Sequence, residues 1–131
     1  HSLDYIPHKE AVDLMNSADF LFLYLDGKER DIYPAKIFEY LAAGKHILAT
    51  IPPDGIAASL VRRFKVGETI APDDVPEITK ALLQIYNDFQ RGRLKVKHSL
   101  KDIAEFSWIK LVSQLGKVFN EVTEKCGEYR K

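Results

Sequence analysis

Runs of apolar residues alternate with helical patterns along the chain, and together they predict strands and helices in turn. Nearly unbroken apolar runs over Asp19–Leu25 and His46–Ile51 are typical of strands that are buried on both faces. Gly67–Ile70 predicts a third, shorter strand, and Ser2–Ile6 is a possible fourth. We therefore expect these strands to lie inside a sheet that is covered by helices.

Between the strands, apolar residues recur at the three- and four-residue spacing of amphipathic helices. One helix is expected to open at Pro7–Lys9, and a second to run from Pro34, as its first residue, through Ala43. Gly44 is the expected stop, because glycine adopts the left-handed conformation at little cost. A short third helix is expected over Ile56–Phe64.

From residue 73 onward the pattern is helical. Asp73 or Asp74 is expected to cap a helix, a connector follows over Gln90–His98, and a final helix spans about Ser107–Glu124. The apolar stripe of the first of these helices comprises Ile78, Ala81, Leu82, Ile85 and Phe89. The stripe of the final helix comprises Trp108, Leu111, Val112, Leu115, Val118, Phe119 and Val122.

This alternation predicts an α/β fold, in which a Rossmann-like parallel sheet is flanked by helices and residues 1–131 form a single domain. Such sheets bind ligands in the crevice outside the carboxyl ends of their strands. The loops expected at that edge are Asp26–Tyr33, Pro52–Gly55 and Ala71–Asp74. We therefore expect a ligand site among these three loops.

Composition and charge limit the class of protein and the kinds of site that are expected. Of the 131 residues, 46% are hydrophobic and 29% are charged, which is enough apolar material for a core. Nineteen basic and 19 acidic residues give a formal net charge of zero, so the charge balance does not indicate a nucleic-acid partner. Cys126 is the only cysteine, which excludes an internal disulfide, and the four histidines show no metal-ligand spacing. We expect a cytoplasmic protein without a metal site.

The connector before the final helix carries a basic run with two interpretations. Its members are Arg91, Arg93, Lys95, Lys97, His98 and Lys101. Such a run can rest on the anionic inner face of a membrane, gaining about 1 kcal/mol per basic residue near the surface. The alternative is a solvated connector, which the sequence favours over peripheral membrane contact.

One stretch carries the candidate chemistry. Asp31 lies in the loop after a strand, and Glu39 follows eight positions later in a helix. Ala35, Ala42 and Ala43 lie on the Glu39 side, where small residues let a ring-shaped ligand approach. The amino end of the helix can bind phosphate, and a carboxylate can accept hydrogen bonds from two sugar hydroxyls. The alternative is an amphipathic helix with a solvated glutamate.

This stretch resembles the signature of family 4 glycosyltransferases, which have the GT-B fold. That signature places two acidic residues eight positions apart, then a glycine and a buried strand, as Asp31, Glu39, Gly44 and His46–Thr50 do here. Further residues that match the family's motifs in order are Ile6-Pro7-His8, Ala18-Asp19-Phe20, Pro34, Lys36, Tyr40, Gly67, Pro72-Asp73-Asp74 and Phe106-Ser107-Trp108. The resemblance covers nearly the whole chain.

The resemblance implies the C-terminal, donor-binding half of a retaining glycosyltransferase, with a UDP- or GDP-sugar as substrate and no cofactor. Glu39 would bind the ribose of this donor, and Asp31 would be the catalytic acidic residue near the donor sugar. The turn that would face the sugar and the diphosphate comprises Ile32, Tyr33 and Pro34, with Lys36 beside it. The acceptor would be a glycan or a lipid-linked sugar.

Measured against that family, the chain lacks the first strands of the donor domain and the whole acceptor domain. We therefore expect the isolated chain to be inactive. Because its sheet would have an open edge, we also expect it either to form a homodimer or to be only marginally stable. The alternative function is a non-catalytic, doubly wound binding or interaction module. That alternative is favoured by the lack of a glycine-rich phosphate loop and of basic residues for the diphosphate.

Overall fold

A computed structural model describes residues 5–96 and 101–128, with side chains described through residue 124. The chain divides into two compact units, His1–Ser99 and Leu100–Lys131. The first unit contains the sheet and most of the helices, and the second is a helical segment. That residues 1–131 form one domain stays a prediction.

The first unit is built on a sheet of three parallel strands in the order β1-β2-β3. These strands are β1 (Phe20–Tyr24), β2 (His46–Thr50) and β3 (Gly67–Ile70), which confirms the three principal strand predictions. In the register, Phe22 lies opposite Leu48, and Leu48 lies opposite Glu68. Of the possible strand over Ser2–Ile6, residues 2–4 lie outside the described residues, and Tyr5 and Ile6 are not in a strand.

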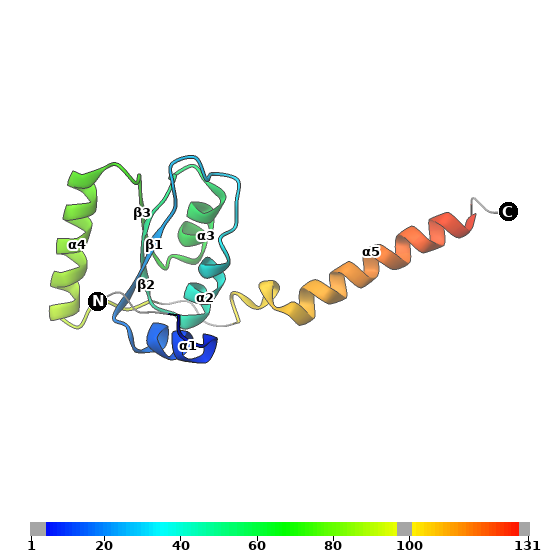
Figure 1. Ribbon diagram of the computed structural model, residues 1–131, viewed down its shortest axis with the longest axis horizontal. Coiled ribbons are helices and arrows are strands. Elements are labelled where there is room, and N and C mark those ends of the chain that lie inside the picture. The colour runs from blue at the N-terminus through cyan, green and yellow to red at the C-terminus, as the bar shows by residue number, and fades with distance from the viewer. Residues whose placement is uncertain (1–4, 97–100, 129–131) are drawn as a thin grey trace. The chain divides into compact units, whose positions relative to one another are not determined.

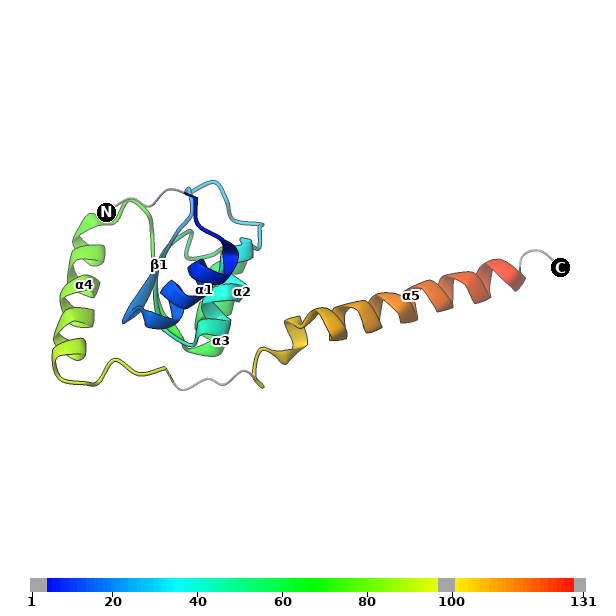
Figure 2. The ribbon, with the colours of Figure 1, turned by 60° about the horizontal axis from the view of Figure 1, so that its bottom comes forward.

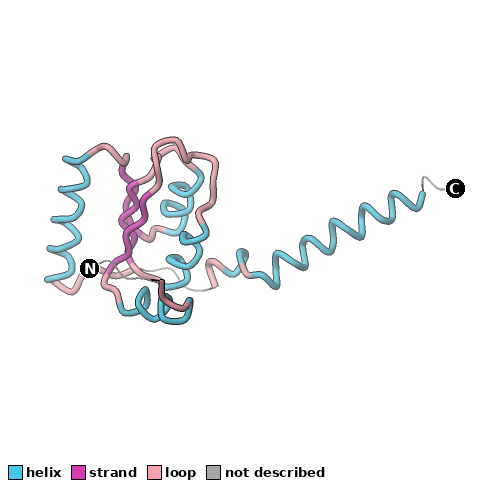
Figure 3. The backbone as a smooth tube through the Cα atoms, viewed as in Figure 1, coloured by secondary structure: helices cyan, strands magenta, loops and turns pink. Residues whose placement is uncertain are grey.

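Helices flank this sheet on both faces, as predicted. They are α1 (His8–Ser17), α2 (Ala35–Ala43), α3 (Ile56–Phe64) and α4 (Val75–Gln90). Figure 1 shows α4 on one face of the sheet and α2 and α3 on the other. In Figure 2, α1 lies in front of α2, and the two helices are in contact. Figure 3 shows the loops that join strands and helices at both ends of the sheet. The unit is therefore an α/β fold of the Rossmann-like type.

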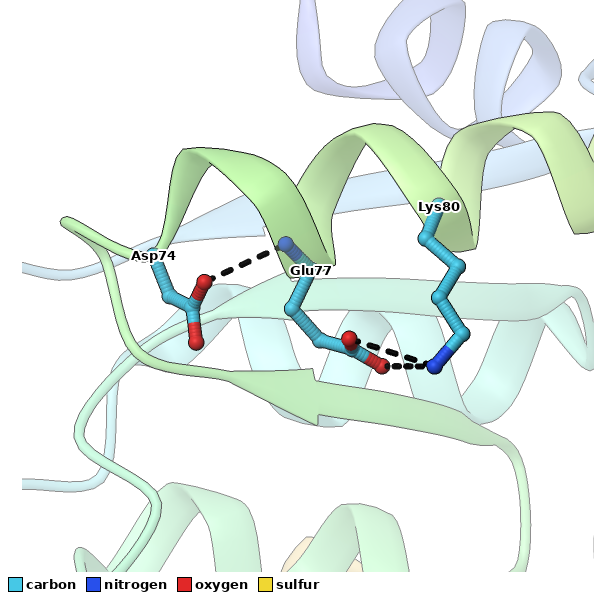
Figure 4. Close-up of polar contacts among 3 residues, drawn as sticks. All are labelled: Asp74, Glu77 and Lys80. Atoms are coloured by element: carbon cyan, nitrogen blue, oxygen red, sulfur yellow. Dashed lines mark hydrogen bonds and ion pairs between the residues drawn. The ribbon is translucent and has the colours of Figure 1, made fainter.

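Local signals end α2 and begin α4 where the sequence indicates. Gly44 adopts the left-handed conformation, with φ of 64°, and ends α2 as predicted. Asp74 caps α4, because its carboxylate accepts a hydrogen bond from the backbone N–H of Glu77 at 3.1 Å. Figure 4 shows this cap and the ion pair between Glu77 and Lys80 one turn later.

The core has a part on each face of the sheet. Ile37 and Leu41 of α2, Ile47 of β2 and Val61 of α3 are all fully buried. On the α4 face, the cluster comprises Leu48, Ile70 and Ile85, with Phe20, Ile78, Ala81 and Leu94 packed against it. Burial of these side chains, at about 1.5–3 kcal/mol each, holds the layers together.

The prediction that β1 is buried on both faces is wrong. Leu21 and Leu23 are buried, but Phe22 is 51% exposed and Tyr24 is 60% exposed. The cause is the position of α4, which packs on Leu48 of β2 and on β3 and leaves most of this face of the edge strand β1 uncovered. A continuous apolar run cannot by itself distinguish a central strand from an edge strand whose second face is bare.

The second unit contains a short 3-10 helix, η1 (Ala104–Phe106), followed by α5 (Trp108–Glu128). The position of α5 confirms the final predicted helix, and the residues of its predicted apolar stripe are exposed. Residues 97–100 of the basic connector lie outside the described residues. Within the described part of the chain, no helix has the length and apolar character needed to cross a membrane.

Candidate functional site

The loop between β1 and α2, which carries Asp31, is ordered by its own acidic side chains. Asp26 accepts a hydrogen bond from the backbone N–H of Lys28 at 3.0 Å. The backbone N–H of Asp26 in turn donates to the carboxylate of Glu29 at 3.1 Å. Both carboxylates therefore hold the turn in shape, which is the usual role of acidic residues beside a tight turn.

Arg30 fastens this loop to the turn between β2 and α3. Its carbonyl oxygen accepts a hydrogen bond from the N–H of Ile56, the first residue of α3, at 2.8 Å. Its guanidinium forms an ion pair with Asp54 on the same turn. Both charged groups are more than half exposed, so the ion pair contributes about 0–1 kcal/mol. Sequence reasoning missed this anchor because its partners lie about two dozen positions further along the chain.

The predicted sugar-facing turn is exposed. Asp31 and Ile32 are exposed, and the Tyr33 ring contacts the ring of Phe38 with centroids 5.9 Å apart. Pro34 is the N-cap of α2 rather than its first residue, so that prediction is wrong by one position. The reason is its extended backbone, with ψ of 133°, from which its carbonyl still accepts the N–H of Ile37 at 3.0 Å.

Glu39 lines a cavity of about 300 Å³ between α1 and α2. The cavity is lined by His8, Val12, Met15, Asn16, Glu39, Ala42 and Ala43. The Glu39 carboxylate is 38% exposed and lies 3.9 Å from Nδ1 of His8. Two of the three alanines expected on the Glu39 side do line this cavity, whereas Ala35 does not. The cavity thus combines one carboxylate, two other polar side chains and small apolar walls.

Tyr40 sets the position of α2 against the sheet. Its hydroxyl donates to the carbonyl oxygen of Phe22 on β1 at 3.2 Å. Burial raises the pKa of the Tyr40 phenol, and the neighbouring charge of Glu39 raises it further. Since Tyr40 follows Glu39 directly, this contact also determines which way the Glu39 side of the helix faces.

Asp31 and Lys36 lie outside the lining of the cavity at Glu39. Lys36 is exposed in the first turn of α2. The cavity lies between two helices, and none of the three loops expected to hold the ligand contributes to its lining. A ligand site at the carboxyl ends of the strands therefore stays a prediction.

Two further observations bear on what the site can hold. Among the described residues, no group of three or more histidine, cysteine, aspartate or glutamate side chains could hold a metal ion. Comparisons of the chain with protein-family models, with curated proteins and with solved structures find no match.

Proposed function

We propose that this chain is the nucleotide-sugar-binding region of a retaining glycosyltransferase of the GT-B type, with the ribose of the donor in the cavity at Glu39. The observation that supports the proposal is the half-exposed Glu39 carboxylate in a cavity of about 300 Å³. A carboxylate only accepts hydrogen bonds, and a ribose offers two adjacent hydroxyls that donate them. His8 and Asn16 of α1 add polar groups to the cavity lining, while Ala42 and Ala43 of α2 leave room for a ring.

The amino end of α2 offers a place for the diphosphate. The N–H groups of Ala35 and Lys36 precede the first hydrogen bond of the helix, which the N–H of Ile37 makes to Pro34. The partial positive charge of a helix amino end favours anions, and the ammonium group of Lys36 lies in the same turn. Glu39 follows about one helical turn later, so ribose and diphosphate would be held by one helix.

In the proposed reaction, the bond between the anomeric carbon and the diphosphate oxygen breaks. A bond forms between the same carbon and an acceptor oxygen, and the proton of the acceptor hydroxyl passes to the leaving diphosphate. Stabilising the charge that develops on the leaving diphosphate is the main catalytic contribution of the α2 amino end. Asp31 would orient the donor sugar through its hydroxyls. The acceptor site belongs to a region outside this chain, and the chain alone is expected to bind donor without turnover.

A non-catalytic binding module is the second candidate. It is favoured because Asp31 does not line the cavity at Glu39 and because the Asp31 loop is exposed. Such a module would bind a nucleotide or a related ligand at Glu39 without any dependence on Asp31. The two candidates therefore differ in what the sugar part of the donor adds to binding.

Calorimetric titration of the chain with UDP, GDP, UDP-glucose and GDP-mannose tests the proposal. We expect either the uridine or the guanosine ligands to bind. Glu39→Gln should weaken their binding roughly 10- to 100-fold, since a hydrogen bond to a charged group contributes about 1.5–3 kcal/mol. Glu10→Gln, which changes an acidic residue on α1 outside the cavity lining, is the matched control and should bind like the parent.

The sugar contact is measured by Asp31→Asn in the same titration. Weaker binding of the nucleotide sugar, with unchanged binding of the free nucleotide, supports a glycosyltransferase donor site. If Asp31→Asn binds both the nucleotide sugar and the free nucleotide as tightly as the parent does, the non-catalytic module is favoured. No heat with any of the four ligands, or equal affinity of Glu39→Gln and the parent, refutes the assignment of the cavity.

A further inference from the structure

The two edges of the sheet differ in how their backbone is covered. The N–H of Leu25 donates to the carbonyl of Thr50 at 3.1 Å, so alternate residues of β1 face β2 and Phe22 turns its backbone outward. The hydroxyl of Tyr40 donates to the outward carbonyl of Phe22 at 3.2 Å. A side chain of α2 therefore covers part of the β1 edge.

The β3 edge is open and runs along a cavity. The N–H of Ile51 donates to the carbonyl of Ile70 at 2.9 Å, so Ile70 faces β2 and Gly67 and Thr69 turn their backbone groups outward. In the described sheet, β3 pairs with β2 alone. An outward row of N–H and C=O groups is a template on which another extended chain can pair.

A cavity of about 550 Å³ lies beside this edge, between β3 and α4. Its apolar lining includes Ile70 of β3, Ala71 directly after this strand, and Ala81 of α4. Figure 4 shows the side chains of Glu77 and Lys80 on the side of α4 that faces the strand. A strand added to β3 would therefore place every second side chain in this cavity.

The charged residues of the cavity are predominantly acidic. Its lining contains three carboxylates, Glu68, Asp74 and Glu77, and one ammonium group, Lys80. Lys80 pairs with Glu77 at 3.0 Å, and the Glu68 carboxylate contacts Nε2 of His46 at 2.6 Å. With a neutral histidine, the lining carries an excess of two negative charges. Arg62 donates to the carbonyl of Pro53 at 2.7 Å and to the hydroxyl of Thr69 at 3.3 Å, but it does not itself line the cavity. A basic side chain in the cavity would find complementary charge.

We propose that the β3 edge binds an extended segment of a partner protein that carries lysine or arginine at alternate positions, as an added strand of the sheet. The backbone of the segment pairs with the outward groups of Gly67 and Thr69, and its basic side chains lie in the acidic cavity beside α4. Main-chain hydrogen bonds provide affinity in this mode of recognition, and the alternate pockets provide specificity. This inference is independent of the donor site at Glu39.

The probe is a fluorescein-labelled octapeptide of alternating lysine and threonine, titrated with the chain and followed by fluorescence anisotropy. Two control peptides isolate the two parts of the proposal. One carries N-methyl groups on alternate amides and cannot donate along one side, and the other has glutamate in place of lysine. We expect both controls to bind at least tenfold more weakly. The N-methylated peptide loses hydrogen bonds, each of which weakens binding about fivefold when lost. The glutamate peptide is repelled by the acidic cavity.

Variants of the chain test whether the peptide binds at β3. Thr69→Pro removes an outward N–H without removing a β2–β3 hydrogen bond, and Thr69→Val loses the same hydroxyl but keeps that N–H. Glu77→Gln reduces the charge of the cavity on an exposed helix position, with Asp13→Asn on α1 as the matched control. Thr69→Pro and Glu77→Gln should weaken binding about fivefold, and the two controls should not change it.

Amide chemical-shift mapping with the same lysine–threonine peptide decides the location. Shifts centred on Gly67 and Thr69 support strand addition at β3. Shifts centred on Phe22 and Tyr24, equal binding of the N-methylated or the glutamate peptide, or equal binding of Glu77→Gln and Asp13→Asn would each overturn the proposal. If Thr69→Pro does not fold, the comparison of Glu77→Gln with Asp13→Asn and the peptide controls still decide it.

Discussion

Gly67 opens β3 at a position where any side chain would enter the neighbouring strand. A Cβ atom built on Gly67 would lie 1.8 Å from the carbonyl oxygen of Ile47 and 2.6 Å from its carbonyl carbon. Real Cβ atoms essentially never come within 3.0 Å of a heavy atom to which they are not covalently linked. The two strands would therefore have to separate by at least 1.2 Å, the difference between 3.0 and 1.8 Å. These are backbone atoms, and no rotamer change relieves the contact. Gly67→Ala must therefore disturb the β2–β3 pairing itself.

The cost of that disturbance follows from the adjoining hydrogen bond. The N–H of Ile47 donates to the carbonyl of Val66 at 2.8 Å, and both residues are fully buried. Separating the strands would stretch this bond to roughly 4 Å, beyond hydrogen-bonding distance. An unsatisfied buried pair costs about 1–3 kcal/mol, and overpacking adds about as much. We expect Gly67→Ala to lose about 2–6 kcal/mol, a large part of the roughly 5–15 kcal/mol that holds a typical domain.

Urea unfolding followed by far-UV circular dichroism measures this loss, with amide hydrogen exchange of β2 as a local readout. Trp108 is the only tryptophan and lies in α5, so its fluorescence reports the second unit and not the β2–β3 pairing. Gly116→Ala in α5 is the matched control, because nothing lies within 4 Å of its added Cβ atom. It should be stabilising by about 0.5–1 kcal/mol. A Gly67→Ala protein whose stability lies within about 1 kcal/mol of the parent would refute the steric argument.

Two further predictions concern the cap of α4 and the contact between α2 and β1. Asp74→Ala removes the acceptor for the N–H of Glu77 and should cost about 1 kcal/mol in urea unfolding, with Asp73→Ala as the matched control. Tyr40 has a folded-state pKa above its ordinary value of 10.0, so its contribution to stability is complete below pH 10 and is lost as pH rises through the folded pKa. Spectrophotometric titration should show one tyrosine that ionises late in the parent and is missing in Tyr40→Phe. If the late transition persists in Tyr40→Phe, the assignment is wrong.

Part of the candidate site could be predicted from the sequence because it depends on one helix. Glu39, Ala42 and Ala43 share a side of α2 by helical spacing alone, and they line the same cavity. The prediction that Asp31 contributes to a ligand site with Glu39 depends instead on the course of a loop. Its backbone is anchored through Arg30 to the turn before α3, and no short-range pattern in the sequence indicates that contact.

The sequence by itself determined the order of strands and helices, the left-handed stop at Gly44, and a cap at either Asp73 or Asp74, of which the structure shows Asp74. Each of these depends on periodicity or on backbone preferences within a few residues, which the chain expresses wherever it folds. Only the tertiary structure decided that α4 covers β2 and β3 and leaves the Phe22 face of β1 bare, and that Tyr40 reaches one sheet edge while the other stays open. The physical reason is that covering a face depends on how elements distant in the sequence pack together, and an apolar run has the same local pattern whether or not a helix lies over it.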